Sequence, residues 1–414
     1  MKRKIAILVT LAFVLALVIG SVPQHTSAQG GVEIIIWMTG GDNDAIVTKA
    51  AAAPWEAATG NTVTVEAVDW GTAHARILTA ATSGEGPDII TGGLSWGIEF
   101  GELGGMIDLA AAYPDDVAAI QATDNESIWA AIESVNGEVY GVPWDLTIFL
   151  MFSRPDLLAE MGLEVPQTWD ELLAYQEAVT EAKGEGGWVS NWGNTEWVTF
   201  SSFLWQAGAD YYDADCNVTL DSDEAVTALE YFASLYEAGA TTEAPDFEAG
   251  LNSGLYPAAY GGNWPIGGLD ANYPDMVGKW QVSPLAAGPN DTRTAFIGGR
   301  VMGIMSYSKN ADVAFDMIKY FQTAEAQQAL IDESVKLNTL WIPPQTEFLQ
   351  YVAYGDNVRE AVAAQLEDAQ APPNCPGWEA SAPAVTEAIQ SVIFEGADAE
   401  DALADAADSI RDNQ

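Results

Sequence analysis

The spacing of apolar residues along the chain predicts strands and helices in alternation. Residues 32–37 form an almost unbroken apolar run, typical of a buried strand, and residues 62–68 alternate with a period of two. Residues 45–58 and 73–82 carry apolar positions at helical spacing, and residues 86–90 begin a further short strand. This order predicts an α/β fold with mixed, mostly parallel sheets flanked by helices.

Beyond Gly162 the pattern becomes more helical. Amphipathic helices are expected at 169–183, 224–238, 311–321, 381–394 and 399–410. Short strands are expected at 255–261, 279–283 and 300–306. A chain of 414 residues is too long for one hydrophobic core, so we expect two lobes.

The first residues indicate secretion. Lys2, Arg3 and Lys4 precede an apolar run over residues 5–20, and Thr26-Ser27-Ala28 offers a small-residue cleavage site. Residues 1–28 are therefore predicted to be a signal peptide, with an uncleaved anchor as the alternative. No cysteine follows the run, so we expect a periplasmic or cell-surface protein that is not lipidated at a lipobox cysteine.

The charge narrows the range of partners. The chain has 60 acidic and 15 basic residues and a formal net charge of −45, which disfavours nucleic acid and anionic membrane surfaces. The acidity suits either solubility in salty water or a cationic ligand. The sequence indicates no cofactor and no metal site.

Cys216 and Cys375 are the only cysteines. An even count in an oxidising compartment permits a disulfide, but the sequence leaves open whether the two residues meet.

One stretch is more specific than the rest. Gly141-Val142-Pro143-Trp144-Asp145 leads into residues 151–173, where Thr168 and Glu171 form a capping box at a helix start. This order resembles the crossover segment of extracellular solute-binding proteins of the maltose-binding type, the capture subunits of ABC importers. Further segments resemble that family in the same order: 53–60, 83–90, 137–143, 258–264, and 296–299 with 308–310.

The resemblance implies a class II type periplasmic-binding-protein fold with a cleft between two lobes. One lobe would hold residues 29–146 and 296–370, and the other 147–295 and 371–414. It also implies a monomer that captures a sugar or oligosaccharide, does not catalyse a reaction, and docks on a membrane permease. A non-sugar solute (a polyamine, amino-acid derivative or phosphate ester) and a secreted glycosidase are the alternatives.

Candidate ligand contacts follow from the 15 tryptophans and their polar neighbours, since aromatic faces pack on sugar rings while carboxylates and amides bind hydroxyl groups. Trp264, after Asn263, matches the family's stacking position best, and Arg300, after Gly299, could bind a ligand or pair with an acid. The remaining candidates lie at the ends of predicted elements: Asp42, Trp70, Ser95, Trp96, Trp144, Asp145, Glu196, Trp197 and Trp378.

Two motifs resemble sites of other protein classes, a hydrolase serine and a calcium loop. Ser95 lies in a Gly-x-Ser-x-Gly sequence like that of hydrolases, but His74 precedes it and no histidine follows it in the chain. Asp213, Asp215, Asn217 and Glu224 have the spacing of a calcium loop, but Val218 occupies the position that requires glycine. We therefore expect no serine-histidine triad, and a hairpin followed by a helix cap instead of a calcium site.

Overall fold

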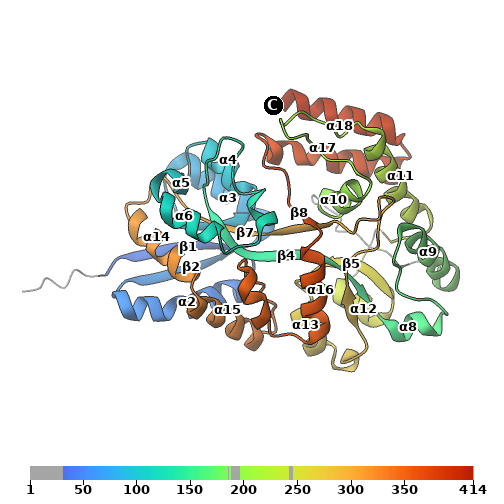
Figure 1. Cartoon of the computed structure of the whole chain (residues 1–414), viewed down its shortest axis with the longest axis horizontal. Helices are drawn as coiled ribbons and strands as arrows, with labels where there is room; N and C mark the ends of the chain where they lie inside the picture. The colour runs from blue at the N-terminus through green and yellow to red at the C-terminus, as the bar shows by residue number, and fades with distance from the viewer. Residues whose placement is uncertain (1–30, 185, 188–195, 242–245, 414) are drawn as a thin grey trace, which may run out of the picture.

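The computed structural model describes residues 31–184, 186–187, 196–241 and 246–413. The predicted signal peptide lies outside these residues, so its cleavage stays a prediction. Figure 1 shows two lobes side by side, joined by long strands that run from one to the other. Within the described residues, no helix is both long enough and apolar enough to cross a membrane.

The first lobe is built on parallel strands. β1 (Glu33–Thr39) lies between β2 (Thr62–Val68) and β3 (Ile89–Gly93) and pairs in parallel with both. The helices that alternate with these strands are α2 (Asp42–Thr59), α3 (Trp70–Ser83) and α4 (Trp96–Glu102). The predicted strand–helix alternation is thus present in this region.

Two strands connect the lobes. β4 (Val142–Ser153) pairs antiparallel with β7 (Ala295–Ile304) through its first half, and with β5 (Ala258–Gly262) and β6 (Gln281–Ser283) through its second half. β7 also pairs antiparallel with β3, and its first two residues pair in parallel with β8 (Ala369–Gln370). The sheet is therefore mixed. Parallel pairing holds around β1 and between β7 and β8, whereas β4 pairs antiparallel with each of its neighbours and β7 pairs antiparallel with β3.

The other helices cover the sheet. Up to β7 they are α5 (Leu109–Ala112), α6 (Pro114–Gln121), α7 (Glu126–Trp129), α8 (Pro155–Glu160), α9 (Trp169–Lys183), α10 (Glu196–Gln206), α11 (Asp223–Glu237), α12 (Phe247–Ser253), α13 (Ile266–Asn272) and the 3₁₀ turn η1 (Pro274–Met276). After β7 they are α14 (Ala311–Phe321), α15 (Ala324–Lys336), the 3₁₀ turn η2 (Thr346–Tyr351), α16 (Asp356–Leu366), α17 (Trp378–Gln390), the π turn η3 (Ser391–Glu395) and α18 (Ala399–Asn413).

Some element limits differ from the prediction. Helices 169–183 and 311–321 occur as predicted, but β7 begins at Ala295 and not at Arg300. The strand thus includes Gly298 and Gly299, in the segment 296–299 that resembles the family. Gly299 has φ 133°, and a Cβ there would lie 2.1 Å from the Asp145 carbonyl oxygen, so the close approach of β4 and β7 requires glycine.

The division between the lobes also differs from the one drawn on the sequence. The Asn357 side chain in α16 accepts a hydrogen bond from Val282 N and donates one to Val282 O, both at 2.9 Å. α16 therefore packs on β6, which pairs with the second half of β4, whereas the sequence-based division placed residues 296–370 in the first lobe.

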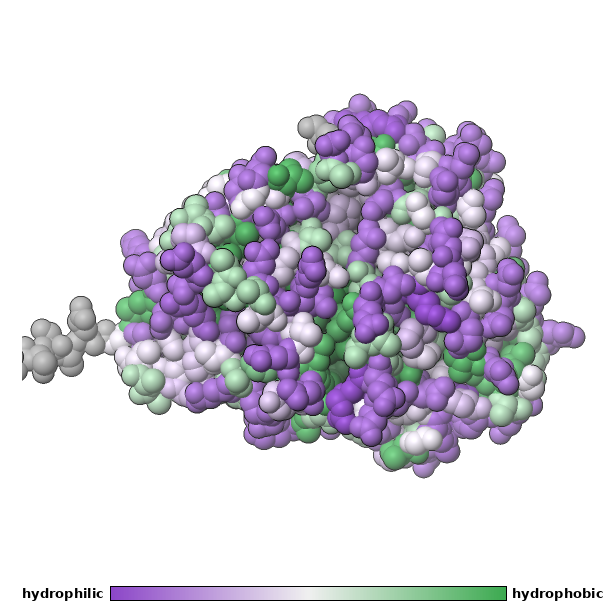
Figure 2. Space-filling model, viewed as in Figure 1, coloured by the Kyte–Doolittle hydropathy of each residue, from purple (hydrophilic) through white to green (hydrophobic). Residues whose placement is uncertain are grey.

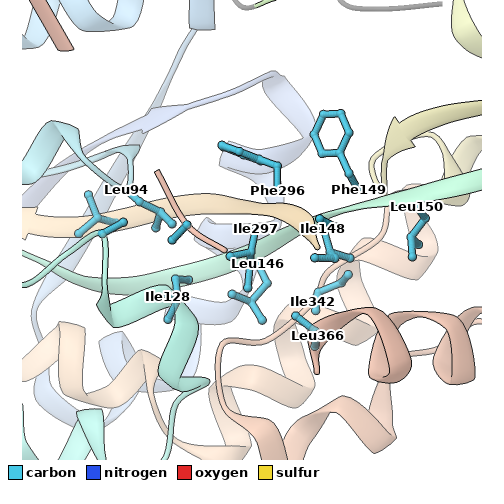
Figure 3. Close-up of a cluster of buried hydrophobic side chains, with 14 of the residues drawn as sticks. Leu94, Ile128, Leu146, Ile148, Phe149, Leu150, Phe296, Ile297, Ile342 and Leu366 are labelled. Atoms are coloured by element: carbon cyan, nitrogen blue, oxygen red, sulfur yellow. The ribbon is translucent and has the colours of Figure 1, made fainter. Parts of the chain in front are cut away.

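The core continues through the junction. Figure 3 shows Leu146, Ile342 and Leu366 on one side of β4 and β7, and Phe149 and Phe296 on the other. Every residue of β4 except Thr147 is buried, which explains its nearly continuous apolar sequence. The face shown in Figure 2 is mostly hydrophilic, with apolar residues gathered in a strip between the two lobes.

Candidate functional site

Arg300 and Asp145, both buried, form an ionic centre with the partly exposed Asp44 where β4 meets β7. Arg300 Nε donates to Asp145 Oδ2 at 3.0 Å, and its Nη1 donates to Asp44 Oδ1 and to the Thr39 carbonyl, both at 2.8 Å. Desolvation would lower the pKa of Arg300, but the two carboxylates raise it above its usual value. Of the two roles open to Arg300, the structure shows the pairing with acids.

Four other predicted contacts have structural roles in this conformation. Trp144 is completely buried, edge to face with Phe321 at 4.8 Å and with Trp341 at 5.0 Å. Asn263 Oδ1 accepts from Ile148 N at 2.9 Å, and the fully buried Glu196 accepts from Gln390 Nε2 at 2.9 Å. Asp145 belongs to the ionic centre. Each of these side chains is buried, and its contact with a ligand stays a prediction.

Asp42 and Gly299 are two further candidates whose contact with a ligand stays a prediction. Asp42 is exposed in the first turn of α2, and Asp44, two residues later, is the acid that reaches Arg300. Gly299 has no side chain and serves the strand crossing described above.

The second lobe carries a continuous series of aromatic rings, here called the aromatic row. Its members contact one another edge to face in the order Trp264, Phe149, Phe296, Trp197 and Trp378, with ring centroids 5.1–5.8 Å apart. Such contacts add to the stability of buried aromatic surface. Trp264, at one end, is 52% exposed, whereas Trp378, at the other, is buried. The row thus leads from solvent into the interior.

The first lobe presents a smaller aromatic cluster made of Trp70, His74, Trp96 and Phe100. The Trp96 ring lies 5.5 Å from Trp70, 5.0 Å from His74 and 6.3 Å from Phe100, each edge to face. Trp70 is 48% exposed. Trp70 and Trp96, both predicted to bind ligand, therefore lie together.

A cavity of 190 Å³ lies where the two lobes meet. Ser95, Glu99 and Glu102 from the first lobe line one side, and Trp378 and Glu379 at the start of α17 line the other. Ser95 Oγ donates a hydrogen bond to Glu379 Oε1. Trp378 Nε1 has no hydrogen-bond partner among the described residues. The cavity therefore combines carboxylate acceptors, a hydroxyl group and an indole ring.

Three titratable groups in or beside the cavity have raised pKa values. Burial raises the pKa of Glu379 to about 7, although hydrogen bonds from Ser95 and Trp96 oppose the rise. The hydrogen bond to Glu99, at 2.6 Å, raises the pKa of His74 against the effect of burial. Burial, with repulsion from Glu138 and Glu99, raises the pKa of Glu102. Each shift reflects a negative, partly dehydrated environment.

A disulfide supports the segment that enters α17. Cys216 and Cys375 are bonded, with their Cα atoms 5.7 Å apart and a sequence separation of 159. The bond ties the residues just before Trp378 and Glu379 to the loop after α10. The sequence had left open whether these two cysteines meet, and the structure shows that they do.

The two misleading motifs have ordinary explanations. His74 Nε2 pairs with Glu99 while Ser95 Oγ donates to Glu379, so the hydrolase-like serine and the histidine have different partners. Asp213 accepts from the backbone N–H groups of Asp215 and Asn217, and Tyr212 pairs antiparallel with Val218. This is the expected hairpin, and Ser222 caps the helix that follows.

Sequence reasoning missed Glu379 and Asp44. Glu379 directly follows the candidate Trp378, but a glutamate at the start of a helix is commonplace, and its burial depends on the opposite lobe. Asp44 is the third residue of α2, two positions after the candidate Asp42, and both are acids of the helix's first turn. Nothing in the local sequence separated either residue from its neighbours.

Comparisons with known proteins place the chain in context. The family model for bacterial extracellular solute-binding proteins matches residues 40–328. A "Probable ABC transporter-binding protein" of Deinococcus radiodurans is 26% identical over 210 residues, which are 47% of this chain and 50% of the relative. An arabinooligosaccharide-binding protein of Halalkalibacterium halodurans is 23% identical over 46% of this chain and 45% of the relative. The matches thus span about half the length of these curated relatives.

Solved structures are similar over almost their full length. A solute-binding protein of Thermotoga lettingae, bound with α-D-tagatose, has a TM-score of 0.80 at 21% identity. The match covers 92% of this chain and 99% of the Thermotoga chain. A cyclic maltosyl-maltose-binding protein of Arthrobacter globiformis has a TM-score of 0.77 at 22% identity, with the same coverage. At this identity the likeness establishes the two-lobed fold.

Proposed function

Because the chain belongs to the bacterial extracellular solute-binding proteins, we propose that it captures a sugar or oligosaccharide between its lobes and delivers it to the permease of an ABC importer. The ligand is released unchanged. The protein acts as a monomer outside the cytoplasm, after removal of residues 1–28 and without a lipid anchor.

The cavity between the lobes is the observation that carries this proposal. It lies between the aromatic cluster of the first lobe and the buried end of the aromatic row in the second. Indole rings pack on the C–H faces of sugars, and the neighbouring carboxylates accept hydrogen bonds from hydroxyl groups. The proposed contacts are Trp70, Trp96, Trp197, Trp264, Trp378 and Glu379.

The proposal has a mechanical basis in the strands that connect the lobes. β4 and β7 pass from one lobe to the other, so a small change in their backbone angles can widen or narrow the cavity. A ligand that touches both lobes stabilises the closed form by the difference between its affinities for the closed and open forms. Micromolar affinity corresponds to about −8 kcal/mol.

Family relatives inform the choice of ligand. Sugars appear in the names of several similar proteins, including those for arabinooligosaccharides and lactose. These relatives differ in the sugar that they are named for, and they share the carbohydrate class, which is the ligand class proposed here.

A saccharide panel tests the proposal. Thermal-shift measurements on the secreted chain are expected to show a melting temperature that rises with the concentration of at least one sugar, because a ligand that binds only the folded state stabilises it. Calorimetry then gives the affinity, and chromatography of the recovered ligand shows whether it is intact. Stabilisation by polyamines but by no sugar, or release of cleaved sugar, would overturn the proposal.

A further inference from the structure

Ser95 and Glu379 join the two lobes directly, although they lie 284 residues apart in sequence. Ser95 is at the turn between β3 and α4 in the first lobe, and Glu379 is the second residue of α17 in the second. Their hydrogen bond links the hydroxyl group to the carboxyl group across the cavity. It can persist only while the lobes are close together.

A second contact crosses the same gap. Asn374 Nδ2 donates to the Glu133 carbonyl oxygen at 2.9 Å, and Glu133 belongs to the first-lobe segment that pairs with Val139. Residues 374–379 are therefore attached to the first lobe at both ends. Their link to the second lobe is the Cys216–Cys375 disulfide and the start of α17.

The surroundings of Glu379 make its bond to Ser95 replaceable. Glu99 and Glu102 on α4 line the same cavity, and His74 on α3 is paired with Glu99. Repulsion from Glu99 acts on Glu379, attraction from His74 opposes it, and Trp96 supplies a hydrogen bond. A carboxyl group can accept several hydrogen bonds, so a sugar hydroxyl could take the place of Ser95.

We propose that the Ser95–Glu379 and Asn374–Glu133 hydrogen bonds form a clasp that closes the lobes in the absence of ligand, and that a sugar hydroxyl replaces Ser95 on Glu379 when ligand binds. The second half of this proposal rests on the proposed function. The first half concerns only the protein and is independent of the ligand's identity.

The clasp is tested first without sugar. Fluorescent dyes on non-natural residues at the exposed positions of Asp115 in α6 and Glu230 in α11 report the distance between the lobes by energy transfer, and leave the disulfide intact. Ser95→Ala and Asn374→Ala are each expected to lower the closed population severalfold. Ser253→Ala is the matched control, because its hydroxyl donates to Gly250 in its own helix. Unchanged distances in both clasp variants would overturn the clasp, whether or not a sugar binds.

Sugar affinity tests the exchange of partners. Glu379→Gln is expected to weaken binding about tenfold, while Ser95→Ala tightens it severalfold because Glu379 is already free to bind the hydroxyl. Equal weakening by both variants would overturn the exchange. If no sugar binds the unmodified protein, the proposed function fails, and the distance measurements still decide the clasp. Circular dichroism confirms that each variant is folded.

Discussion

Arg300 and Glu379 are both charged residues near the junction of the lobes, but their surroundings differ. Arg300 is held by two carboxylates and a carbonyl oxygen on strands and a helix of one continuous sheet region. Glu379 is held chiefly by a hydroxyl and an indole group from the opposite lobe. A buried charge whose partners belong to one packed unit supports the architecture, whereas one whose partners lie across a gap can report whether that gap is closed.

The largest expected effect comes from breaking the Arg300 centre. Asp145→Ala leaves Arg300 buried with part of its charge uncompensated, so the free energy of unfolding should fall by about 3–5 kcal/mol. Urea denaturation measures the change. Glu379→Gln is the comparison, and it should cost much less. Equal losses in the two variants would remove the distinction between the two residues.

Removal of the disulfide tests whether residues 374–379 need this bond to keep Glu379 in position. Replacing both Cys216 and Cys375 by serine should lower stability by about 2–5 kcal/mol, since a long loop is no longer closed in the unfolded chain. Closure of the lobes should also weaken, because residues 374–379 lose their anchor. A variant that loses stability yet closes normally would show that α17 alone positions Glu379.

Trp264 tests whether the aromatic row extends the site beyond Glu379. Trp264→Ala should weaken sugar affinity at least about tenfold, or about 1.4 kcal/mol, without unfolding the protein, because half of this ring is exposed. Trp280→Ala is the matched control, since that indole bonds to Asp270 away from the cavity. Calorimetry with the sugar found in the panel provides the measurement. Unchanged affinity would remove Trp264 from the site.

The smallest expected effect is a dependence on pH. Enclosure raises the pKa of Glu379 from 4.5 to about 7, so closing the lobes takes up a proton. The resulting stabilisation of the closed form is complete below the pKa of the exposed carboxyl group and is lost as pH rises through about 7.

Energy transfer between the two dyes should therefore fall between about pH 5 and about pH 8. Glu379→Gln should flatten this response. His74→Gln separates the contribution of the histidine, whose pKa is also raised. A response that survives in Glu379→Gln and disappears in His74→Gln would assign the titration to the histidine.

The sequence predicted some residues of the candidate site but not the direction in which each side chain faces. Trp70, Ser95, Trp96, Trp197 and Trp378 were expected near a ligand, and the structure gathers them around one cavity or the rings beside it. Trp144 looked equally suitable, since it follows a proline at the crossing. It is buried instead, because β4 turns that face toward Phe321 and Trp341. Local sequence shows that a tryptophan lies at an element's end, but not the side of the sheet it faces.

By itself, the sequence determined the elements and the family. Periodicity located α9 and α14, which are set by local spacing and caps, and the ordered motifs identified an extracellular solute-binding protein. The tertiary structure alone decided that Cys216 meets Cys375, that Arg300 pairs with Asp44 and Asp145, and that Glu379 faces Ser95. These contacts join residues far apart in the chain, and they depend on how the two lobes pack, which no local pattern encodes.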